Sequence, residues 1–386
     1  MAGMTRRIVF LTGTRADFGK LKPLMHAVDG CPAFEGAVFV TGMHMLSRYG
    51  LTIDEVTKAG FSRIHAFMNQ FHGEPSEHIL ANTITGLSRY VQEYQPDMIV
   101  VHGDRVETLA GAIVGTLRNV LVAHIEGGEL SGTIDETIRH AVSKLAHLHF
   151  VANEEAAERL RQLGEQPQSI RVIGSPDIDI MLSSDLPDLD EVRRHYGIAA
   201  PEYGIVLFHP VTTELHAQHR AAAELVAALV ESGLDYVVIY PNNDPGSDAI
   251  LEQYAALHGD PRFTLLPSMR FEFFLTLLRH ASFIAGNSSA GIREAPVYGV
   301  PTVNIGSRQQ NRFRYESIFD VPNDRAVIGD AIASALRMES VRPSRFFGDG
   351  HSAPRFLRAL CCSAVWETPR QKQFHDMEPA AVPVLT

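Results

Sequence analysis

The sequence predicts an α/β fold of two Rossmann-like, doubly wound domains that face each other across a cleft. Two observations support this prediction. Short apolar runs alternate with segments of helical spacing through both halves of the chain, which is the pattern of a parallel sheet covered by helices. In each half, small and polar residues directly follow the apolar runs, at the edge where open α/β sheets bind ligands.

The length of the chain favours two domains. Its 386 residues are 45% hydrophobic and 20% charged, which is ordinary for a globular protein of this size. A loop-rich segment at 176–201 separates the two βα series. We therefore predict an N-terminal domain at 1–176, a C-terminal domain at 177–366 and a poorly ordered tail at 367–386. Whether the last helix packs back onto the first domain is left open.

Charge and cysteine content argue against several classes of protein. The formal net charge is −11, the pI is about 5.9, and no block of like charge stands out, so neither nucleic acid nor an anionic membrane is an expected partner. Three cysteines without a C-x-x-C pattern are typical of a reducing cytoplasm. The first apolar run is too short for a signal peptide, and no run reaches membrane-spanning length. A cytoplasmic location is expected.

The first half contains six predicted strands. They are expected at 6–12, 34–41, 98–102, 120–125, 148–152 and 170–173. Helices are expected from about residue 17, within 52–95, at 105–118, from 134 onward and at 154–163, with a loop at 70–75. The spacing of His140, His147 and His149 fits neither a helical pair nor a usual zinc pattern, so no metal site is predicted.

Three carboxylates organise this half. Asp104 and Glu126 follow two neighbouring predicted strands, and Asp135 lies in the first turn of the next helix, with Ser131 or Thr133 as its cap. Any one of them has an ordinary structural explanation, because helix N-termini favour acids and Asp135 is one turn from Arg139. Together they predict a catalytic crevice, and their mutual repulsion is expected to raise at least one of their pKa values.

Positively charged and imidazole side chains surround this edge. His102, Arg105, His124 and Arg139 are expected beside the three acids. A glycine-bearing turn at 13–19 precedes a helix, and free backbone N–H groups there would suit a phosphate, with Arg15 as a candidate ligand or a surface arginine.

The second half has the same organisation. Strands are expected at 204–208, 236–240, 263–266, 282–285 and 301–305, and helices at 216–232, 270–280 and through residue 298. The turn at 286–291 combines small residues with a helix start, so Ser288 and Ser289 are expected to bind a diphosphate and Glu294 a ribose. A tight turn with serine caps is the structural alternative. His209 and Arg308 also follow strands and are candidate phosphate partners.

Several long motifs make a family resemblance specific. The motifs are G-T-R-A-D (13–17), T-G-x-H (41–44), H-G-D-R (102–105), H-I-E-G-G (124–128), D-E-x-I-R-H-A-x-S-K (135–144), H-P-V-T-T (209–213), P-N-N-D (241–244), G-N-S-S-x-G-x-R-E (286–294) and G-x-R-Q (306–309). This set resembles the UDP-N-acetylglucosamine 2-epimerase family from about residue 6 to 362. The H-I-E-G-G stretch is similar to the hydrolysing branch, which serves sialic-acid-type sugars, and differs from the H-x-E-A-G of the non-hydrolysing branch.

The resemblance implies a GT-B-type pair of domains, no metal or redox cofactor, and a nucleotide-sugar substrate. It implies that UDP-N-acetylglucosamine loses UDP and its C2 proton to form a glycal, to which water adds, giving N-acetylmannosamine. Asp104, Glu126 and Asp135 would be catalytic, with the base and the acid among them unassigned. The implied substrate contacts are Arg15, Arg105, His209, Ser288, Ser289 and Arg308 for the diphosphate, Glu294 for the ribose, His44 and Arg139 for the sugar, and Asn243 and Gly286 within the matched motifs.

Four alternatives stay open from the sequence. The same reaction could act on a UDP- or GDP-linked 2,4-diacetamido-2,4,6-trideoxy sugar of a legionaminic-type pathway. The chain could instead be a non-hydrolysing 2-epimerase, a GT-B glycosyltransferase, or a nucleotide-sugar sensor without catalysis. The transferase and the sensor have no need of three clustered acids. By resemblance, a homodimer or homotetramer is expected.

Overall fold

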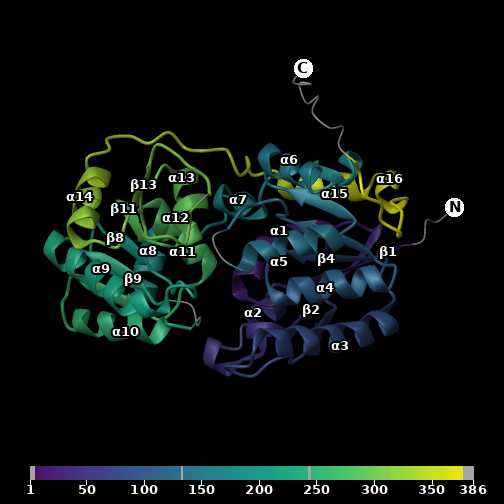
Figure 1. Cartoon of the computed structure of the whole chain (residues 1–386), viewed down its shortest axis with the longest axis horizontal. Helices are drawn as coiled ribbons and strands as arrows, with labels where there is room; N and C mark the ends of the chain where they lie inside the picture. Colours follow the sequence, from purple (N-terminus) through teal and green to yellow (C-terminus); the bar gives the residue numbers. More distant parts are fainter. Residues whose placement is uncertain (1–4, 132–133, 242–244, 311, 377–386) are drawn as a thin grey trace, which may run out of the picture. The chain divides into compact units, whose positions relative to one another are not determined.

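The computed structural model describes residues 5–131, 134–241, 245–310 and 312–376 and contains two parallel sheets, as predicted (Figure 1). The first compact unit comprises residues up to Glu129, Asp135–Asp179 and the segment from Gly348 onward, and the second is mainly Ile180–Phe347.

In the described residues, seven strands form the first sheet, in the order β3-β2-β1-β4-β5-β6-β7. The strands are β1 (Arg6–Thr12), β2 (Phe34–Val40), β3 (Ile64–Ala66), β4 (Met98–His102), β5 (Leu121–Ile125), β6 (Leu148–Val151) and β7 (Ile170–Val172). The helices of this unit are α1 (Arg15–Asp29), α2 (Ile53–Lys58), α3 (Ser76–Tyr94), α4 (Val106–Leu117), α5 (Ile134–Leu145), α6 (Glu154–Gln162), α7 (Pro176–Met181), α15 (Ser352–Leu360) and α16 (Ser363–Trp366), with 3-10 turns η1 (Gly42–Met45), η2 (Ser47–Tyr49) and η3 (Pro167–Ser169).

The central strand β1 is buried on both faces. Ile8 and Phe10 contribute to the apolar cluster on one side, and Val9 and Leu11 to the cluster on the other. This explains why the strands read as continuous apolar runs rather than as alternating patterns. Because β1 lies between β2 and β4, the chain reverses its direction of progress across the sheet at the β1–β4 pair, which is where doubly wound sheets bind ligands.

Helix α15, the last but one of the described helices, packs back onto the first unit. Its Phe356 is fully buried and meets Phe150 of β6 edge-to-face, with 4.8 Å between the ring centroids. Asp179 accepts hydrogen bonds from the backbone N–H groups of Ser352 and Ala353, 2.8 Å each, and so caps the start of α15. In this structure α15 therefore packs against the first sheet, and the predicted domain limits stay a prediction.

In the described part of the second unit, six strands form a sheet in the order β10-β9-β8-β11-β12-β13. The strands are β8 (Gly204–Leu207), β9 (Tyr236–Ile239), β10 (Phe263–Leu266), β11 (Phe283–Gly286), β12 (Thr302–Ile305) and β13 (Ile318–Val321). The helices are α8 (Leu189–Tyr196), α9 (Gln218–Ser232), α10 (Ser247–Tyr254), α11 (Phe271–Arg279), α12 (Ser289–Arg293), α13 (Ala295–Tyr298) and α14 (Arg325–Leu336), with 3-10 turns η4 (Leu215–Ala217) and η5 (Ala255–Leu257). Here the reversal lies between β8 and β11.

Three local details differ from the sequence prediction. The segment predicted as a loop-rich boundary contains α7 and α8, and α8 has clear end signals: Asp188 accepts a hydrogen bond from Asp190 N (2.8 Å) and Gly197 ends the helix at φ +66°. The single helix expected after β11 is divided into α12 and α13, because Pro296 lacks the N–H that a continuous helix needs. The elements β3, α10, β13 and α14 were not predicted.

The tail is more ordered than predicted up to residue 376. Lys372 Nζ donates to two carbonyls in the last turn of α5, at 3.1 Å to Ser143 and 2.8 Å to Lys144, and to the carbonyl of Ala146 just beyond the helix at 2.6 Å. His375 N donates to Gly164 O (2.9 Å). None of the helices in the described ranges is long and apolar enough to cross a membrane.

Candidate functional site

The turn after β1 is satisfied internally, contrary to the expectation of free N–H groups. Thr14 caps α1, and the Asp17 carboxylate accepts from the N–H groups of Gly13 and Thr14 (3.0 Å each) and from Thr12 Oγ1 (2.6 Å). These amides are therefore already committed to Asp17. Phosphate binding here would rest on Arg15, whose guanidinium pairs with Glu55 of α2 at 2.7 Å and stays partly exposed.

His44 is buried in η1 with both ring nitrogens in hydrogen-bonding contact. Nε2 lies 3.1 Å from Thr12 Oγ1 and Nδ1 lies 2.7 Å from Thr52 Oγ1. Burial lowers the pKa of His44, so the ring is neutral. Its place in the structure is a packing one, and its predicted contact with the sugar stays a prediction.

Glu126 lies at the carboxyl end of β5 in a left-handed backbone conformation, with φ +61°. Its side chain is 4% exposed, and one carboxylate oxygen, Oε2, lies 3.1 Å from His102 Nε2 and 3.7 Å from Lys20 Nζ. The other, Oε1, contacts the hydroxyl of Ser175. A non-glycine residue in this region costs free energy, and such residues cluster at functional sites.

A second carboxylate shares these partners. Asp177, in the first turn of α7, is fully buried, contacts the Ser175 hydroxyl through Oδ1, and lies 2.9 Å from Lys20 Nζ through Oδ2. The sequence interpretation missed Lys20, Ser175 and Asp177. The signal was present, since Ser175 and Asp177 directly follow β7 at the same sheet edge, but the Gly-Ser-Pro stretch was taken only as a domain boundary.

Asp104 is paired with a buried arginine. Arg139 NH2 forms an ion pair with Asp104 Oδ2, and its NH1 donates to the backbone carbonyl of Glu126 (2.9 Å) and lies 3.5 Å from Glu129 Oε2. The Arg139 side chain is 7% exposed. Arg139 thus joins the turn after β4, through Asp104, to the turn after β5, through the backbone of Glu126. The predicted catalytic convergence of Asp104, Glu126 and Asp135 stays a prediction.

The remaining predicted residues of this edge have different surroundings. Asp135 is partly buried in the first turn of α5, one turn before Arg139; of its two candidate caps, Ser131 is buried and Thr133 lies outside the described residues. The Arg105 side chain is exposed, and its Nε lies 3.4 Å from Glu107 Oε2.

His124, on β5, contacts the turn that carries Asp104. Its ring is fully buried, with Nε2 2.8 Å from Gly103 O and Nδ1 3.1 Å from Ser143 Oγ. Burial lowers its pKa to about 3, so the imidazole is neutral and holds the turn that carries Asp104.

Two further histidines of this unit have structural partners. His147 Nδ1 accepts from Val122 N (3.0 Å), and His149 Nε2 lies 3.0 Å from Glu165 Oε2. Within the described ranges, no group of three His, Cys, Asp or Glu side chains could hold a metal ion.

In the second unit, Gly286 and Asn287 shape the strand-end turn. Gly286 has φ +136°, and a Cβ atom there would lie 2.0 Å from Leu207 O, so only glycine fits. Asn287, which the sequence interpretation did not single out, clamps two strand ends: its Oδ1 accepts from His209 N (2.7 Å) and its Nδ2 donates to His209 O (2.8 Å).

The predicted phosphate ligands gather around this clamp. Arg308 NH1 donates to Asn287 O (3.2 Å), and Ser288 caps α12 by accepting from Ala290 N. Burial and the neighbouring Arg308 charge lower the pKa of His209 to about 3. His209 is therefore neutral in this structure and would bind a phosphate through a hydrogen bond rather than as a cation.

Three other predicted residues complete the account of this unit. Ser289 is half-buried at the start of α12, and Glu294 is buried at the junction of α12 and α13. Asn243 lies outside the described residues. The nucleotide-binding roles of this set stay predictions.

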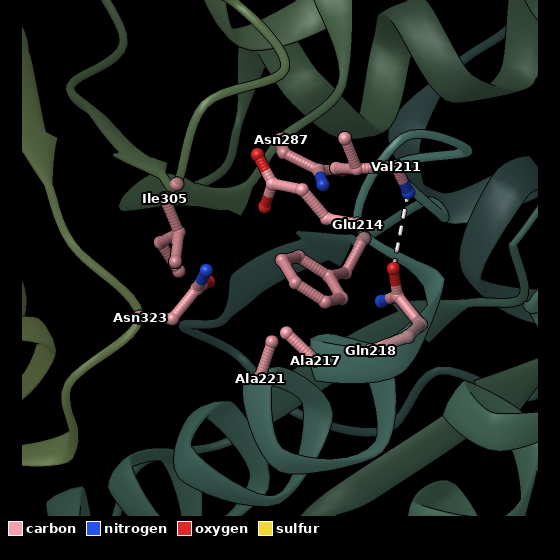
Figure 2. Close-up of a pocket in the computed structure, with 10 residues that line it drawn as sticks. Val211, Glu214, Ala217, Gln218, Ala221, Asn287, Ile305 and Asn323 are labelled. Atoms are coloured by element: carbon pink, nitrogen blue, oxygen red, sulfur yellow. Dashed lines mark hydrogen bonds between the residues drawn. The ribbon is translucent and has the colours of Figure 1, made fainter.

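Beside the clamp lies a small pocket that the sequence did not predict (Figure 2). It is lined by Glu214, directly before η4, by Asn287, after β11, and by Asn323, after β13. Gln218 Oε1 accepts a hydrogen bond from Val211 N at 3.0 Å beside it. Its other lining residues are Phe208, Ala217, Ala221, Ile305 and Gly306. The pocket therefore combines a few polar side chains with a mainly apolar lining.

Comparison with known proteins places these features in context. A family model described as UDP-N-acetylglucosamine 2-epimerase matches residues 26–361. The UDP-N-acetylglucosamine 2-epimerase of Neisseria meningitidis serogroup B is 49% identical over 375 residues, covering 96% of this chain and 99% of its own. The UDP-N,N'-diacetylbacillosamine 2-epimerase (hydrolyzing) of Legionella pneumophila is 31% identical, covering 92% of this chain and 96% of its own. Among solved structures, a co-structure of S. aureus MnaA with UDP has the same fold, with a TM-score of 0.78, 20% identity, and coverage of 96% of this chain and 100% of that one.

Proposed function

Since the chain belongs to the UDP-N-acetylglucosamine 2-epimerase family, we propose that it is a hydrolysing 2-epimerase that converts UDP-N-acetylglucosamine into N-acetylmannosamine and UDP. In the proposed reaction the C1–O bond breaks and the C2 proton is removed, giving a glycal. Water then adds to C1 and a proton returns to C2 from the opposite face. The product would enter sialic-acid-type sugar biosynthesis in the cytoplasm.

The observation that carries the proposal is the pair of acids at the ends of β4 and β5. The C2 proton has no neighbouring carbonyl to acidify it, so its removal requires positive charge at C1, which carboxylates stabilise. Asp104 is held beside Arg139, which favours its anion, and Glu126 lies beside the Lys20 ammonium and the Ser175 hydroxyl. Asp135 completes the proposed set from α5. One acid takes a proton and another returns one.

The second unit would hold the nucleotide. The residues in and beside the turn after β11 are proposed to bind it. The diphosphate would be bound by Ser288, Ser289, Arg308 and neutral His209, and the ribose by Glu294. On the first unit, Arg15 and Arg105 are proposed to contact the diphosphate and His44 and Arg139 to line the sugar site. Neutralising the diphosphate makes it a better leaving group, which favours early cleavage at C1.

Release of the sugar by hydrolysis is the most specific part of the proposal. It is supported by the H-I-E-G-G motif and by the Legionella pneumophila relative, whose name states hydrolysis. That relative also favours a second candidate, in which the same reaction acts on UDP-N,N'-diacetylbacillosamine. The sequence identity of 49% to a protein named as a UDP-N-acetylglucosamine 2-epimerase makes UDP-N-acetylglucosamine the first choice of substrate.

Proton NMR of the purified protein with UDP-N-acetylglucosamine in heavy water, without an acceptor, tests the proposal. The expected products are UDP and N-acetylmannosamine that carries deuterium at C2. Accumulation of UDP-N-acetylmannosamine would contradict hydrolysis, and no turnover without an acceptor would favour a glycosyltransferase. A parallel reaction with UDP-N,N'-diacetylbacillosamine tests the second candidate, and turnover of that sugar alone would replace the first.

A further inference from the structure

We propose that Glu126 and Asp177 share one proton through the hydroxyl of Ser175, and that Asp177 is a positioning residue that keeps Glu126 supplied with a proton. The part of this inference that concerns the reaction rests on the function proposed above. The part that concerns the proton is a property of the resting protein and can be tested without substrate.

The geometry joins the three side chains in one chain of contacts. Ser175 Oγ is in hydrogen-bonding contact with Glu126 Oε1 on one side and with Asp177 Oδ1 on the other. Ser175 and Asp177 are fully buried, and Glu126 is 3% exposed as a residue. Glu126 follows β5, whereas Ser175 and Asp177 follow β7 and enter α7, so the contacts bring together side chains 49 residues apart in sequence.

Counting hydrogens leads to the shared proton. A serine hydroxyl carries one hydrogen and can donate to only one of two carboxylates. The other carboxyl can make a favourable contact with the same oxygen only by donating a proton of its own. Two ionised carboxylates on one hydroxyl would instead place an anion against a lone pair. The pair therefore holds one proton, either as Glu126–OH with anionic Asp177 or as Asp177–OH with anionic Glu126.

The neighbouring charges agree with one proton for the pair. Lys20 Nζ lies 2.9 Å from Asp177 Oδ2 and 3.7 Å from Glu126 Oε2, so this lysine cation can balance one negative charge shared by the two carboxyls. His102 of β4 lies 3.1 Å from Glu126, and the Arg139 guanidinium is already engaged by Asp104 and the Glu126 carbonyl. The competing arrangement, two anions balanced by Lys20 and a cationic His102, is an outcome that the test below separates.

The shared proton gives Glu126 a defined role. When Glu126 gives its proton to C2 of the glycal, its O–H bond breaks and a C–H bond forms, while water attacks C1 and releases one proton. That released proton restores the single proton of the pair. If it arrives on Asp177, two transfers return a proton to Glu126. The Asp177–OH proton passes to Ser175 Oγ, and the hydroxyl hydrogen of Ser175 passes to Glu126. Asp177 is then again an anion, and Ser175 again carries one hydrogen. Asp177 need not touch the substrate.

Infrared spectroscopy of the resting protein is the direct test. A protonated carboxyl has a C=O stretch that is distinct from carboxylate bands and shifts in heavy water. We expect such a band near neutral pH in the wild type, its loss in Asp177→Asn and in Glu126→Gln, and a changed frequency in Ser175→Ala, which keeps both carboxyls. The matched control is Asp179→Asn, on the same helix, whose oxygens cap α15 instead. A spectrum that is identical in all variants would overturn the proposal in favour of two anions.

Kinetics with UDP-N-acetylglucosamine test the role. Asp177→Asn and Ser175→Ala should each lower kcat about 10- to 100-fold with KM little changed, which is less than the loss of about 10²- to 10⁴-fold expected on removing a general acid itself. The alkaline limb of the kcat profile should move to lower pH in Asp177→Asn, because a lone carboxyl holds its proton less tightly than a pair that would repel as anions. Asp179→Asn should keep the wild-type profile.

The outcomes separate the two proposals. An inactive wild type with the predicted infrared band would remove the proposed function and retain the shared proton. An active wild type whose pH profile is unchanged in Asp177→Asn and Ser175→Ala would remove the inference and retain the function. If Asp177→Asn does not fold, Ser175→Ala alone decides, since it removes only a hydroxyl.

Discussion

Glu126 combines an unfavourable backbone conformation with a buried carboxylate. Its φ of +61° is one that side-chain-bearing residues avoid at a cost of about 1–2 kcal/mol. The next two residues are glycines that cannot be replaced freely: a Cβ on Gly127 would lie 2.8 Å from His124 Nδ1, and one on Gly128 would lie 2.2 Å from Ala156 O. The turn is therefore sharp, and the chain retains a glutamate where a glycine would be less strained.

The backbone strain at Glu126 predicts that a glycine variant is more stable than an alanine variant, which is the reverse of the usual order. Glu126→Gly and Glu126→Ala both remove the carboxylate, and activity should fall by at least about 10²-fold in each. Since glycine adopts positive φ without a Cβ clash, Glu126→Gly should be more stable than Glu126→Ala by about 1 kcal/mol. Urea unfolding of both variants measures this difference. An alanine variant as stable as the glycine variant would show that the turn relaxes.

Gly286 gives a second prediction at this scale, with a matched control. Gly286→Ala would place a Cβ 2.0 Å from Leu207 O at φ +136°, so we expect a loss of more than about 3 kcal/mol of unfolding free energy or failure to fold. At Gly329, in the middle of α14, a Cβ would meet no atom of the described residues within 4 Å beyond its own stretch of helix, so Gly329→Ala should stabilise by about 0.5–1 kcal/mol. Thermal unfolding of the pair decides, and equal effects would contradict the proposed clash.

At the scale of elements, the segment after α16 stabilises the end of α5. The C-terminal carbonyls of a helix lack intrahelical partners, and Lys372 donates to two of them and to the carbonyl of Ala146 directly after the helix. Lys372 and Lys144 also pair with the buried carboxylate of Glu165. Burial lowers the pKa of Lys372 to about 8, and Glu165 opposes that effect. Thus a segment predicted to have little order closes the end of α5 opposite to the end that carries Asp135.

This contact predicts a stability that depends on pH. Burial would raise the pKa of Glu165, but the hydrogen bond from His149 and the Lys372 charge outweigh it and lower the pKa to about 2, from a usual 4.5. Because the pKa is lowered by folding, the stabilisation is complete above about pH 4.5 and is lost as the pH falls toward 2. Its size is at most about 3 kcal/mol.

Glu165→Gln should therefore be less stable than the wild type at pH 7, and its unfolding free energy should fall less steeply as the pH drops from about 5 to about 3. Urea unfolding at a series of pH values measures both effects. Glu158→Gln is the control, because Glu158 forms an exposed pair with Arg161 at 2.9 Å and its loss should change stability by less than about 1 kcal/mol. Parallel pH curves for Glu165→Gln and the wild type would contradict the role assigned to Glu165.

At the scale of the whole molecule, two doubly wound sheets each present polar residues at one strand-end edge. In the first sheet the edge carries carboxylates, with Arg139 and Lys20 beside them, and in the second it carries Asn287, Ser288 and Arg308. The acids suit the chemistry proposed for the sugar, and the second set suits a diphosphate. The domain limits, the homo-oligomeric state and the cytoplasmic location stay predictions.

The chemistry proposed for this molecule predicts that metal removal has no effect. Family resemblance implies no metal, and protein cations beside the acids can provide the charge that a metal would otherwise supply. Turnover of UDP-N-acetylglucosamine should therefore change by less than about twofold after treatment with a chelator, measured by NMR. Loss of activity that one added divalent cation restores would contradict this expectation. Glu126→Gln, assayed in parallel, gives the background turnover rate of an inactive protein.

The sequence determined the class of fold and the edge at which chemistry is proposed. Strands such as β1 and β4 are buried on both faces, so they appear as apolar runs, and their ends appear as abrupt changes to glycine and charge. This is why Asp104, Glu126 and Arg139 could be predicted to lie together, and why the turn at Gly286 could be identified. Local end signals were present for α8, too, but were outweighed by the prolines and aspartates around it.

Only the tertiary structure decided how each charge is used. Asp17 takes the amides that were predicted to bind phosphate, burial makes His209 neutral, and Lys372 returns from the end of the described chain to α5. Ser175 and Asp177 join Glu126 from β7, which lies two strands away from β5 in the sheet. Periodicity reports which residues are buried within an element, whereas hydrogen-bond partners and desolvation depend on which distant elements pack together, and that is set by the fold alone.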